Sequence, residues 1–237
     1  MKQIIAMGGG GFSMEPENPL LDQYILKQAS SRKPKVCFVP TASGDSEGYI
    51  NGFYKAFDQL ECIPSHLSLL KPPTGDLEDF VLDKDIIYVG GGNTRNLLIL
   101  WKEWKLDTYL RRAWENQTVL AGISAGSICW FEQGVTDSIP GQLTKLDCLG
   151  FLSGSNCPHY DGEADRRASY HQLMKSNEVI SGKAADDGVA FHFADQEVYR
   201  VVSSRPSARA YQVEKMIDGE IQETEIVPVY LGTNEAL

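Results

Sequence analysis

One serine of the sequence has neighbours that are typical of a catalytic nucleophile. Ser124 lies in the segment Gly-Ile-Ser-Ala-Gly at residues 122–126, between an expected strand and a short expected helix. A serine on such a tight turn projects its hydroxyl outward, and small flanking residues let the strained backbone turn without clashes. The following amide, that of Ala125, then points into the same space and can donate to an oxyanion. The segment predicts a nucleophile elbow; its alternative is an ordinary strand–helix junction.

A serine hydroxyl becomes a good nucleophile only when a base takes its proton, so this hypothesis requires a histidine. Of the four histidines, His66, His171 and His192 fall in an expected strand, helix and strand, where a structural role is the default. His159 instead lies in a proline-braced loop at residues 156–161, where a scaffold can hold a functional side chain. We therefore predict that His159 is the base.

The third member of such a site is a carboxylate that accepts a hydrogen bond from the imidazole. The candidates are Asp137, Asp161, Asp186 and Asp187. Asp137 lies in an expected loop after the nucleophile's helix, whereas Asp186 and Asp187 precede a glycine between two expected strands. A solvated turn is the alternative there, and the residues alone do not separate the candidates.

Two glycine-rich segments follow expected strands. Residues 88–94, Tyr-Val-Gly-Gly-Gly-Asn-Thr, open onto a helix that Asn93 or Thr94 can cap. Backbone amides in such a turn can bind an anion, but the segment matches neither common nucleotide-binding glycine motif, so an oxyanion contribution fits better. For the earlier run at residues 8–11, close backbone packing is the default interpretation.

These residues must be positioned by a fold, and apolar runs predict its elements. Strands are expected at 3–7, 35–39, 66–70, 85–89 and 119–123, and helices at 20–29, 49–60, 94–104 and 106–116. This alternation is typical of an α/β fold with a doubly wound, mostly parallel sheet flanked by helices. Residues 136–155, rich in Gly, Ser and Pro, are expected to form an active-site loop.

The remaining elements follow from weaker patterns. A helix is expected at 163–176, and strands at 179–181, 189–193 and 197–202. Residues 211–217 and 221–227 predict a C-terminal β-hairpin, with Asp218-Gly219 as a two-residue turn. Residues 232–237 are expected to be loose.

Composition limits the functional classes. The chain of 237 residues is 42% hydrophobic, so we expect one domain over residues 1–237 with a sufficient core. Its formal charge of -10 and lack of a dense basic run argue against nucleic acid or membrane surfaces as partners. The longest uncharged apolar stretch, 119–131, is too short to span a bilayer, and the first residues are too few for a signal peptide. Five scattered cysteines without a C-x-x-C pair favour reduced thiols, a cytoplasmic location and no metal site.

Together, Gly-Gly-Gly-Asn-Thr at 90–94, the nucleophile segment 32 residues after Gly92, and Pro-His-Tyr at 158–160 resemble peptidase E, the aspartyl dipeptidase family of serine peptidases. The resemblance covers most of the chain. It implies a class I glutamine amidotransferase-like fold with serine in place of cysteine at the elbow. It also implies that no cofactor is needed and that the substrates are small peptides. The members that gave the family its name cleave dipeptides with an N-terminal aspartate.

The resemblance carries roles over to individual residues. Ser124 matches the nucleophile, His159 the base, and Gly92 with Ala125 the oxyanion amides. Asp187 matches a position where the family often has glutamate before glycine, and Asp137 matches a second family aspartate. Because aspartate is shorter than glutamate, Asp187 would need a closer backbone. Cys157 departs from the family, whose dipeptidases tend to have asparagine there, so substrate preference can have drifted.

An acidic N-terminal residue would call for a cation in the site. Arg166 or Arg167 is the nearest candidate in sequence, with a solvent-facing helix position as the alternative, and Asn93 is a second expected substrate contact. Other serine hydrolases, either a cyanophycinase-like exopeptidase or an esterase, are the alternative enzymes. A catalytically silent amidotransferase-like binding protein is the alternative outside enzymes. We expect a monomer or a homodimer.

Overall fold

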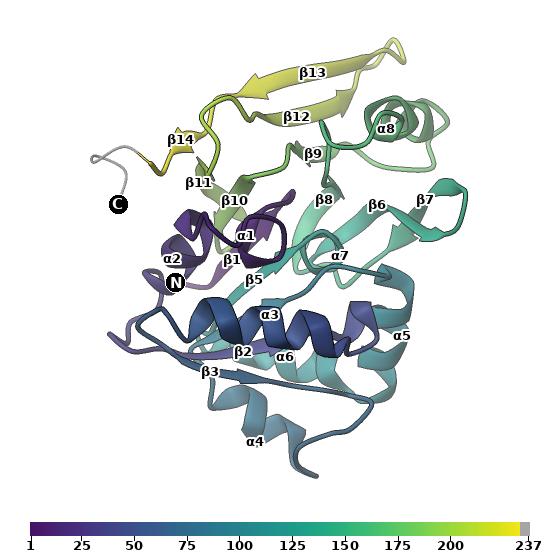
Figure 1. Ribbon diagram of the computed structural model, residues 1–237. Coiled ribbons are helices and arrows are strands. Elements are labelled where there is room, and N and C mark those ends of the chain that lie inside the picture. The colour runs from purple at the N-terminus through teal and green to yellow at the C-terminus, as the bar shows by residue number, and fades with distance from the viewer. Residues whose placement is uncertain (233–237) are drawn as a thin grey trace.

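The centre of the protein is an eight-stranded sheet (Figure 1). The computed structural model describes residues 1–232. In spatial order the strands are β14 (Val229–Tyr230), β11 (Glu197–Ser203), β10 (Val189–Ala194), β1 (Gln3–Met7), β5 (Val119–Ile123), β4 (Ile86–Val89), β2 (Lys35–Val39) and β3 (Ile63–His66). Within the described residues β10 is the one strand of this sheet that runs antiparallel to its neighbours. The mostly parallel sheet is thereby confirmed.

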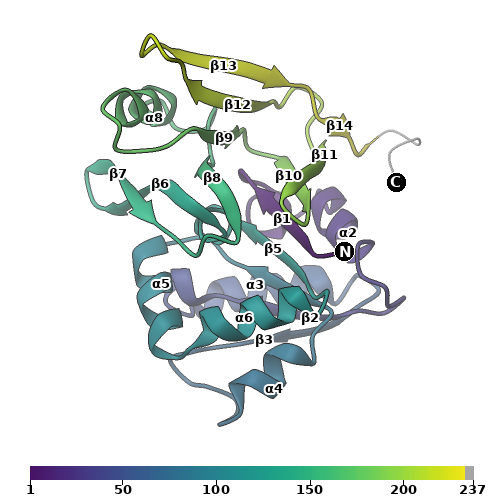
Figure 2. The same ribbon diagram turned by 180° about the vertical axis from the view of Figure 1, so that it is seen from behind.

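Helices cover both faces of this sheet. One face packs against α1 (Gly11–Met14), α2 (Leu20–Leu26) and α3 (Glu47–Phe57), and the other against α4 (Leu77–Leu82), α5 (Thr94–Glu103) and α6 (Leu106–Glu115). Figures 1 and 2 show α3 and α6 on opposite sides. Successive strand residues enter opposite cores, Ile5 with α2 and α3, and Ile4 with α5 and α6. Because both faces are buried, these strands are apolar at nearly every position.

A second sheet of six strands lies beside the first. Its order is β13 (Ile221–Ile226), β12 (Ala210–Lys215), β9 (Gly182–Ala185), β8 (Leu152–Cys157), β6 (Phe131–Ile139) and β7 (Gln142–Asp147). Helix α8 (Arg166–Lys175) packs on it through Tyr170 and Met174, in a small core of its own. Both views show α8 beside the β6–β7 hairpin and the β12–β13 hairpin (Figures 1 and 2).

The second sheet corrects the expected active-site loop at residues 136–155. Most of this segment belongs to β6, β7 and β8, so Asp137 lies on a strand and not in a loop. β7 is at most half-buried along its length, which explains the polar composition that suggested a loop. The strand expected at 179–181 is also wrong, because β9 begins at Gly182. Likewise β3 ends at His66, where a strand was expected to begin.

The expected C-terminal hairpin is confirmed as β12 and β13, but its turn is not the predicted two-residue turn. Residues 216–220 connect the strands, the amide of Met216 donates to the carbonyl of Glu220, and Gly219 has a φ of 88°. Of the segment expected to be loose, residues 233–237 lie outside the described residues. No helix within residues 1–232 has the length and apolar character that crossing a membrane requires.

Candidate active site

Ser124 lies at a sharp turn between β5 and α7 (Ala125–Ile128), with φ 55° and ψ -114°. Non-glycine residues seldom adopt a positive φ, so the fold holds this residue in a strained conformation. Two glycines make the turn possible. A Cβ on Gly122 would lie 2.1 Å from the carbonyl oxygen of Gly126, and one on Gly126 would lie 2.3 Å from that of Val89. The elbow therefore has the geometry that its sequence pattern predicts.

His159 lies in the loop after β8 and is fixed from two sides. Its amide donates to the carbonyl of Gly8 at 3.1 Å, and the next amide, that of Tyr160, donates to the carbonyl of Ala185 at 3.1 Å. The imidazole Nδ1 lies 2.7 Å from Oδ1 of Asp187, and both side chains are largely buried. With Nδ1–H donating to the carboxylate, Nε2 keeps a lone pair that can accept a proton.

Asp187 reaches the histidine because the surrounding backbone leaves room for its carboxylate. A Cβ on Gly9 would lie 2.0 Å from its Oδ1, and a Cβ on Gly162 would lie 2.8 Å from its Oδ2. The amide of Asp187 donates to Oδ1 of Asp161 at 2.8 Å, which fixes the turn between β9 and β10. This close backbone is what an aspartate requires at a position where the family often has glutamate.

The other carboxylate candidates have different positions. Asp161 supports the backbone of Asp187, and Asp186 accepts from the amide of Arg209 at 2.8 Å. Burial raises the pKa of Asp186 to about 6, against the lowering effect of that amide. Asp137 is exposed on β6, and within residues 1–232 its side chain has no hydrogen bond or ion pair. Of the four candidates, the structure brings Asp187 to the imidazole.

Ser124, His159 and Asp137 border one polar pocket of about 340 Å³ at the carboxyl ends of β4 and β5. Ligands commonly bind at this edge of an α/β sheet. The pocket is lined by Gly92, Asn93, Ser124, Asp137, Ser138, His159, Glu163 and Arg166. Ser138 and Glu163 were not predicted. Neither carries a motif, although the spacing of Glu163 and Arg166 is that of a helical ion pair.

The sequence predicts that the backbone amides of Gly92 and Ala125 donate to an oxyanion. Within residues 1–232 the amides of Gly92 and Ala125 donate no hydrogen bond, whereas those of Gly91 and Asn93 donate to the Tyr49 hydroxyl and the Ala42 carbonyl. Gly92 has a φ of 135°, and a Cβ there would lie 2.2 Å from the oxygen of Ala42. This glycine loop passes directly beside Ser124, because a Cβ on Gly91 would lie 3.3 Å from the Cβ of Ser124.

Asn93 lines the pocket but serves mainly as the cap of α5. Its Oδ1 accepts from the amide of Asn96 at 2.9 Å, and its Nδ2 donates to the carbonyl of Ser138 at 3.0 Å. The second of these bonds ties the glycine loop to β6. To contact a substrate, the Asn93 side chain would have to use the remaining N–H of Nδ2 as a donor or the second lone pair of Oδ1 as an acceptor.

The two arginine candidates differ. Arg166 lines the pocket and is 2% exposed, but its guanidinium donates to Glu163, with Nη2 at 2.6 Å, and to the carbonyl of Val135. Arg167 is outside the residues that line the pocket, pairs with Glu223 on β13 and lies over the ring of Tyr160. The alternative of a solvent-facing position is therefore wrong for Arg166. Arg167 does lie on the surface, with its side chain half-exposed and paired with Glu223.

The remaining histidines have structural partners. His66 bonds to the Tyr54 hydroxyl, and His171 bonds to Glu223. His192 is fully buried against the Tyr24 hydroxyl, and burial lowers its pKa to about 4. Among the residues that the structure describes, no group of three His, Cys, Asp or Glu side chains could hold a metal ion.

The chain matches known peptidases over most of its length. The model of peptidase family S51 matches residues 4–201. The peptidase YgaJ of Bacillus subtilis (strain 168) is 63% identical over 98% of this chain and all of its own length. The peptidase Lmo0363 of Listeria monocytogenes is 28% identical over 60% of this chain and 72% of its own.

Two solved structures share the fold. A Listeria monocytogenes EGD-e protein with a provisional peptidase E name has a TM-score of 0.63 at 21% identity, covering 87% of this chain and all of that one. A peptidase from an acI-B1 actinobacterium has a TM-score of 0.69 at 17% identity, covering 96% of this chain and 95% of that one. The family match and the YgaJ relationship together show that this chain is a peptidase of family S51.

Proposed function

We propose that this peptidase is a serine exopeptidase that hydrolyses short peptides, with Ser124 as nucleophile, His159 as base and Asp187 as the acid of the triad. The observation that carries the proposal is the 2.7 Å hydrogen bond between His159 and Asp187, made beside a pocket that Ser124 also lines. The strained turn at Ser124 gives independent support, since backbone strain concentrates at functional sites.

In the proposed reaction, Nε2 of His159 takes the proton of the Ser124 hydroxyl as Oγ attacks the scissile carbonyl. Asp187 holds the ring and stabilises the imidazolium. The amides of Gly92 and Ala125 donate to the oxyanion, each contributing roughly 3 to 4 kcal/mol to transition-state stabilisation. The imidazolium then protonates the leaving amine as the C–N bond breaks. Water, deprotonated by the same histidine, hydrolyses the acyl-enzyme and regenerates Ser124.

An N-terminal aspartate preference is the finer part of this proposal. Arg166 is the cation in the pocket wall, and its guanidinium already pairs with Glu163. A substrate carboxylate would therefore have to share the Arg166 guanidinium with Glu163 or displace Glu163 from it. Either arrangement carries an energetic cost that a neutral substrate side chain avoids. We include neutral and acidic N-terminal residues as substrate candidates for this reason.

We further propose that the enzyme acts in the cytoplasm as a monomer or homodimer. The location is supported by the cysteines, because the five within the described residues are free thiols and four are buried. Reduced, unpaired thiols are usual in cytoplasmic proteins.

The test is hydrolysis of Asp-Xaa, Glu-Xaa, Gly-Xaa and β-Asp-Xaa dipeptides without added metal or nucleotide. The wild type is compared with Ser124→Ala and with Ser207→Ala, a control that removes an exposed hydroxyl outside the pocket. We expect at least one dipeptide to be cleaved by the wild type and the control but not by Ser124→Ala. Cleavage that persists in Ser124→Ala would overturn the proposed nucleophile.

A further inference from the structure

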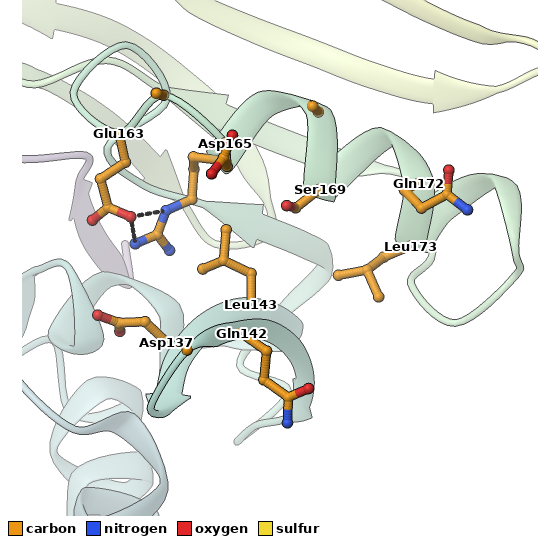
Figure 3. Close-up of a pocket in the computed structure, with 12 residues that line it drawn as sticks. Asp137, Gln142, Leu143, Glu163, Asp165, Ser169, Gln172 and Leu173 are labelled. Atoms are coloured by element: carbon orange, nitrogen blue, oxygen red, sulfur yellow. Dashed lines mark hydrogen bonds and ion pairs between the residues drawn. The ribbon is translucent and has the colours of Figure 1, made fainter.

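A larger groove adjoins the catalytic pocket. It has a volume of about 810 Å³ and lies between the β6–β7 hairpin and α8 (Figure 3). Asp137, Glu163 and Arg166 line both cavities, so the groove and the pocket meet at these three residues. The groove is therefore adjacent to the pocket that Ser124 lines.

The groove walls have the composition of a ligand site. In Figure 3, Leu143 on one wall extends toward α8, which carries Ser169 and Leu173 on the other wall, and Gln142 also lines the groove. Ligand sites in proteins are generally clefts of about 300 to 1,000 Å³ lined by apolar surface with a few polar groups. The two leucines supply the apolar surface, whereas the glutamine and serine side chains can bond to a peptide backbone.

The groove is lined by more negative than positive side chains. Asp137, Glu163 and Asp165 contribute three carboxylates, and Arg166 contributes one guanidinium. That guanidinium is bound by Glu163, and within residues 1–232 the side chains of Asp137 and Asp165 have no ion pair. The uncompensated carboxylates favour a positively charged group in the groove.

We propose that this groove binds the part of a peptide substrate that extends from one side of the scissile bond, with a preference for lysine or arginine there. The inference rests on the proposed function, because it needs Ser124 to act on a peptide. It extends that function from dipeptides to longer, basic peptides.

The test measures kcat/KM for the best dipeptide and for two series of its extensions to six residues, one lengthened at each end. Each series is made with either lysine or glutamate in the added part. We expect kcat/KM to rise at least tenfold with length in one series, and lysine to exceed glutamate there by at least fivefold.

Variants connect the length effect to the groove. Ser169→Trp on α8 and Gln142→Trp on β7 each fill it from one wall, and Ile99→Trp places the same ring on an exposed site of α5. We expect either filling variant to reduce the hexapeptide-to-dipeptide ratio of kcat/KM at least fivefold, and Ile99→Trp to leave the ratio as in the wild type. If one of the two filling variants does not fold, the other still measures the effect of blocking the groove.

The possible results separate this inference from the proposed function. Equal kcat/KM for all lengths, or a length effect that both folded filling variants retain, would overturn the groove assignment while dipeptide cleavage by Ser124 stands. Lack of any Ser124-dependent cleavage would overturn the proposed function itself. A preference for glutamate over lysine would contradict the charge argument.

Discussion

Asp187 and His159 are joined by a 2.7 Å hydrogen bond although 28 residues separate them in the chain. The contact depends on a third segment, the glycine run after β1. Its Gly8 carbonyl holds the amide of His159, and its Gly9 carbonyl accepts from the amide of Gly188. The glycine run therefore fixes both partners of the hydrogen bond at one end of the parallel sheet.

If Asp187 orients His159, Asp187→Asn must reduce turnover by disfavouring the required tautomer. In Ser-His-Asp peptidases such a change costs roughly 10⁴ in kcat, and we expect a loss of about 10³ to 10⁴ here. Asp137→Asn is the comparison, and we expect less than a tenfold loss of dipeptide kcat from it, because Asp137 has no contact with the imidazole among the described residues. Steady-state kinetics of both variants decides, and the reverse order of effects would assign the acid to Asp137.

A methyl group at Gly9 should damage the same hydrogen bond sterically. Its Cβ would lie 2.0 Å from Oδ1 of Asp187, so the carboxylate must move away from His159. We predict that Gly9→Ala lowers kcat at least 100-fold. Gly75→Ala is the matched control, because a Cβ there meets no atom within 4 Å and should leave kcat as it is. Wild-type kinetics in a folded Gly9→Ala protein would contradict the proposed positioning.

Substitution of Gly92 tests whether its backbone amide stabilises the oxyanion. Valine at this position must abandon a φ of 135° and avoid the Ala42 carbonyl, so the amide shifts away from the developing oxyanion. We expect kcat to fall by about 10² to 10³, the usual cost of losing one such donor, with a smaller change in KM. Circular dichroism verifies folding, and near-normal kcat in Gly92→Val would exclude this amide from catalysis.

Asp22 should make stability depend on pH. Burial raises its pKa to about 7, opposed by hydrogen bonding from Tyr88 and the Phe12 backbone, and its Oδ1 has no partner among the described residues. The folded protein keeps this proton above the unfolded-state pKa, so the free energy of unfolding falls as pH rises from about 4 to about 7.

The variant Asp22→Asn removes this titration. Between pH 5 and pH 8, we expect its free energy of unfolding to gain about 2 to 3 kcal/mol relative to the wild type. Urea denaturation of both proteins at the two pH values measures the change, and other titrating groups cancel in the difference. Parallel pH dependences would mean that Asp22 is already ionised in the folded protein.

The sequence predicted the features that depend on local patterns. The parallel strands are apolar at nearly every position because both faces are buried, and the elbow needs small residues within one short segment. Ser124, His159 and the glycine loop at Gly92 were found for this reason. The structure brings all three to one pocket.

Features that depend on distant contacts were not predictable. The contact of His159 with Asp187 and not with Asp137 depends on room left by Gly9 and Gly162, which come from two other loops. The second sheet was missed where half-exposed strands such as β7 carry a polar, loop-like composition. Glu163 was missed because its importance comes from neutralising Arg166, a contact visible only once α8 is placed.

The most direct test of the account is labelling of Ser124 by a fluorophosphonate, which reacts with a serine only when that serine is activated. The label is located by peptide mass spectrometry in the wild type, in His159→Gln and in Ser207→Ala. We predict modification of Ser124 in the wild type and Ser207→Ala, and at least 100-fold slower modification in His159→Gln. An unlabelled wild type, or equal labelling rates with and without His159, would contradict the proposed serine mechanism.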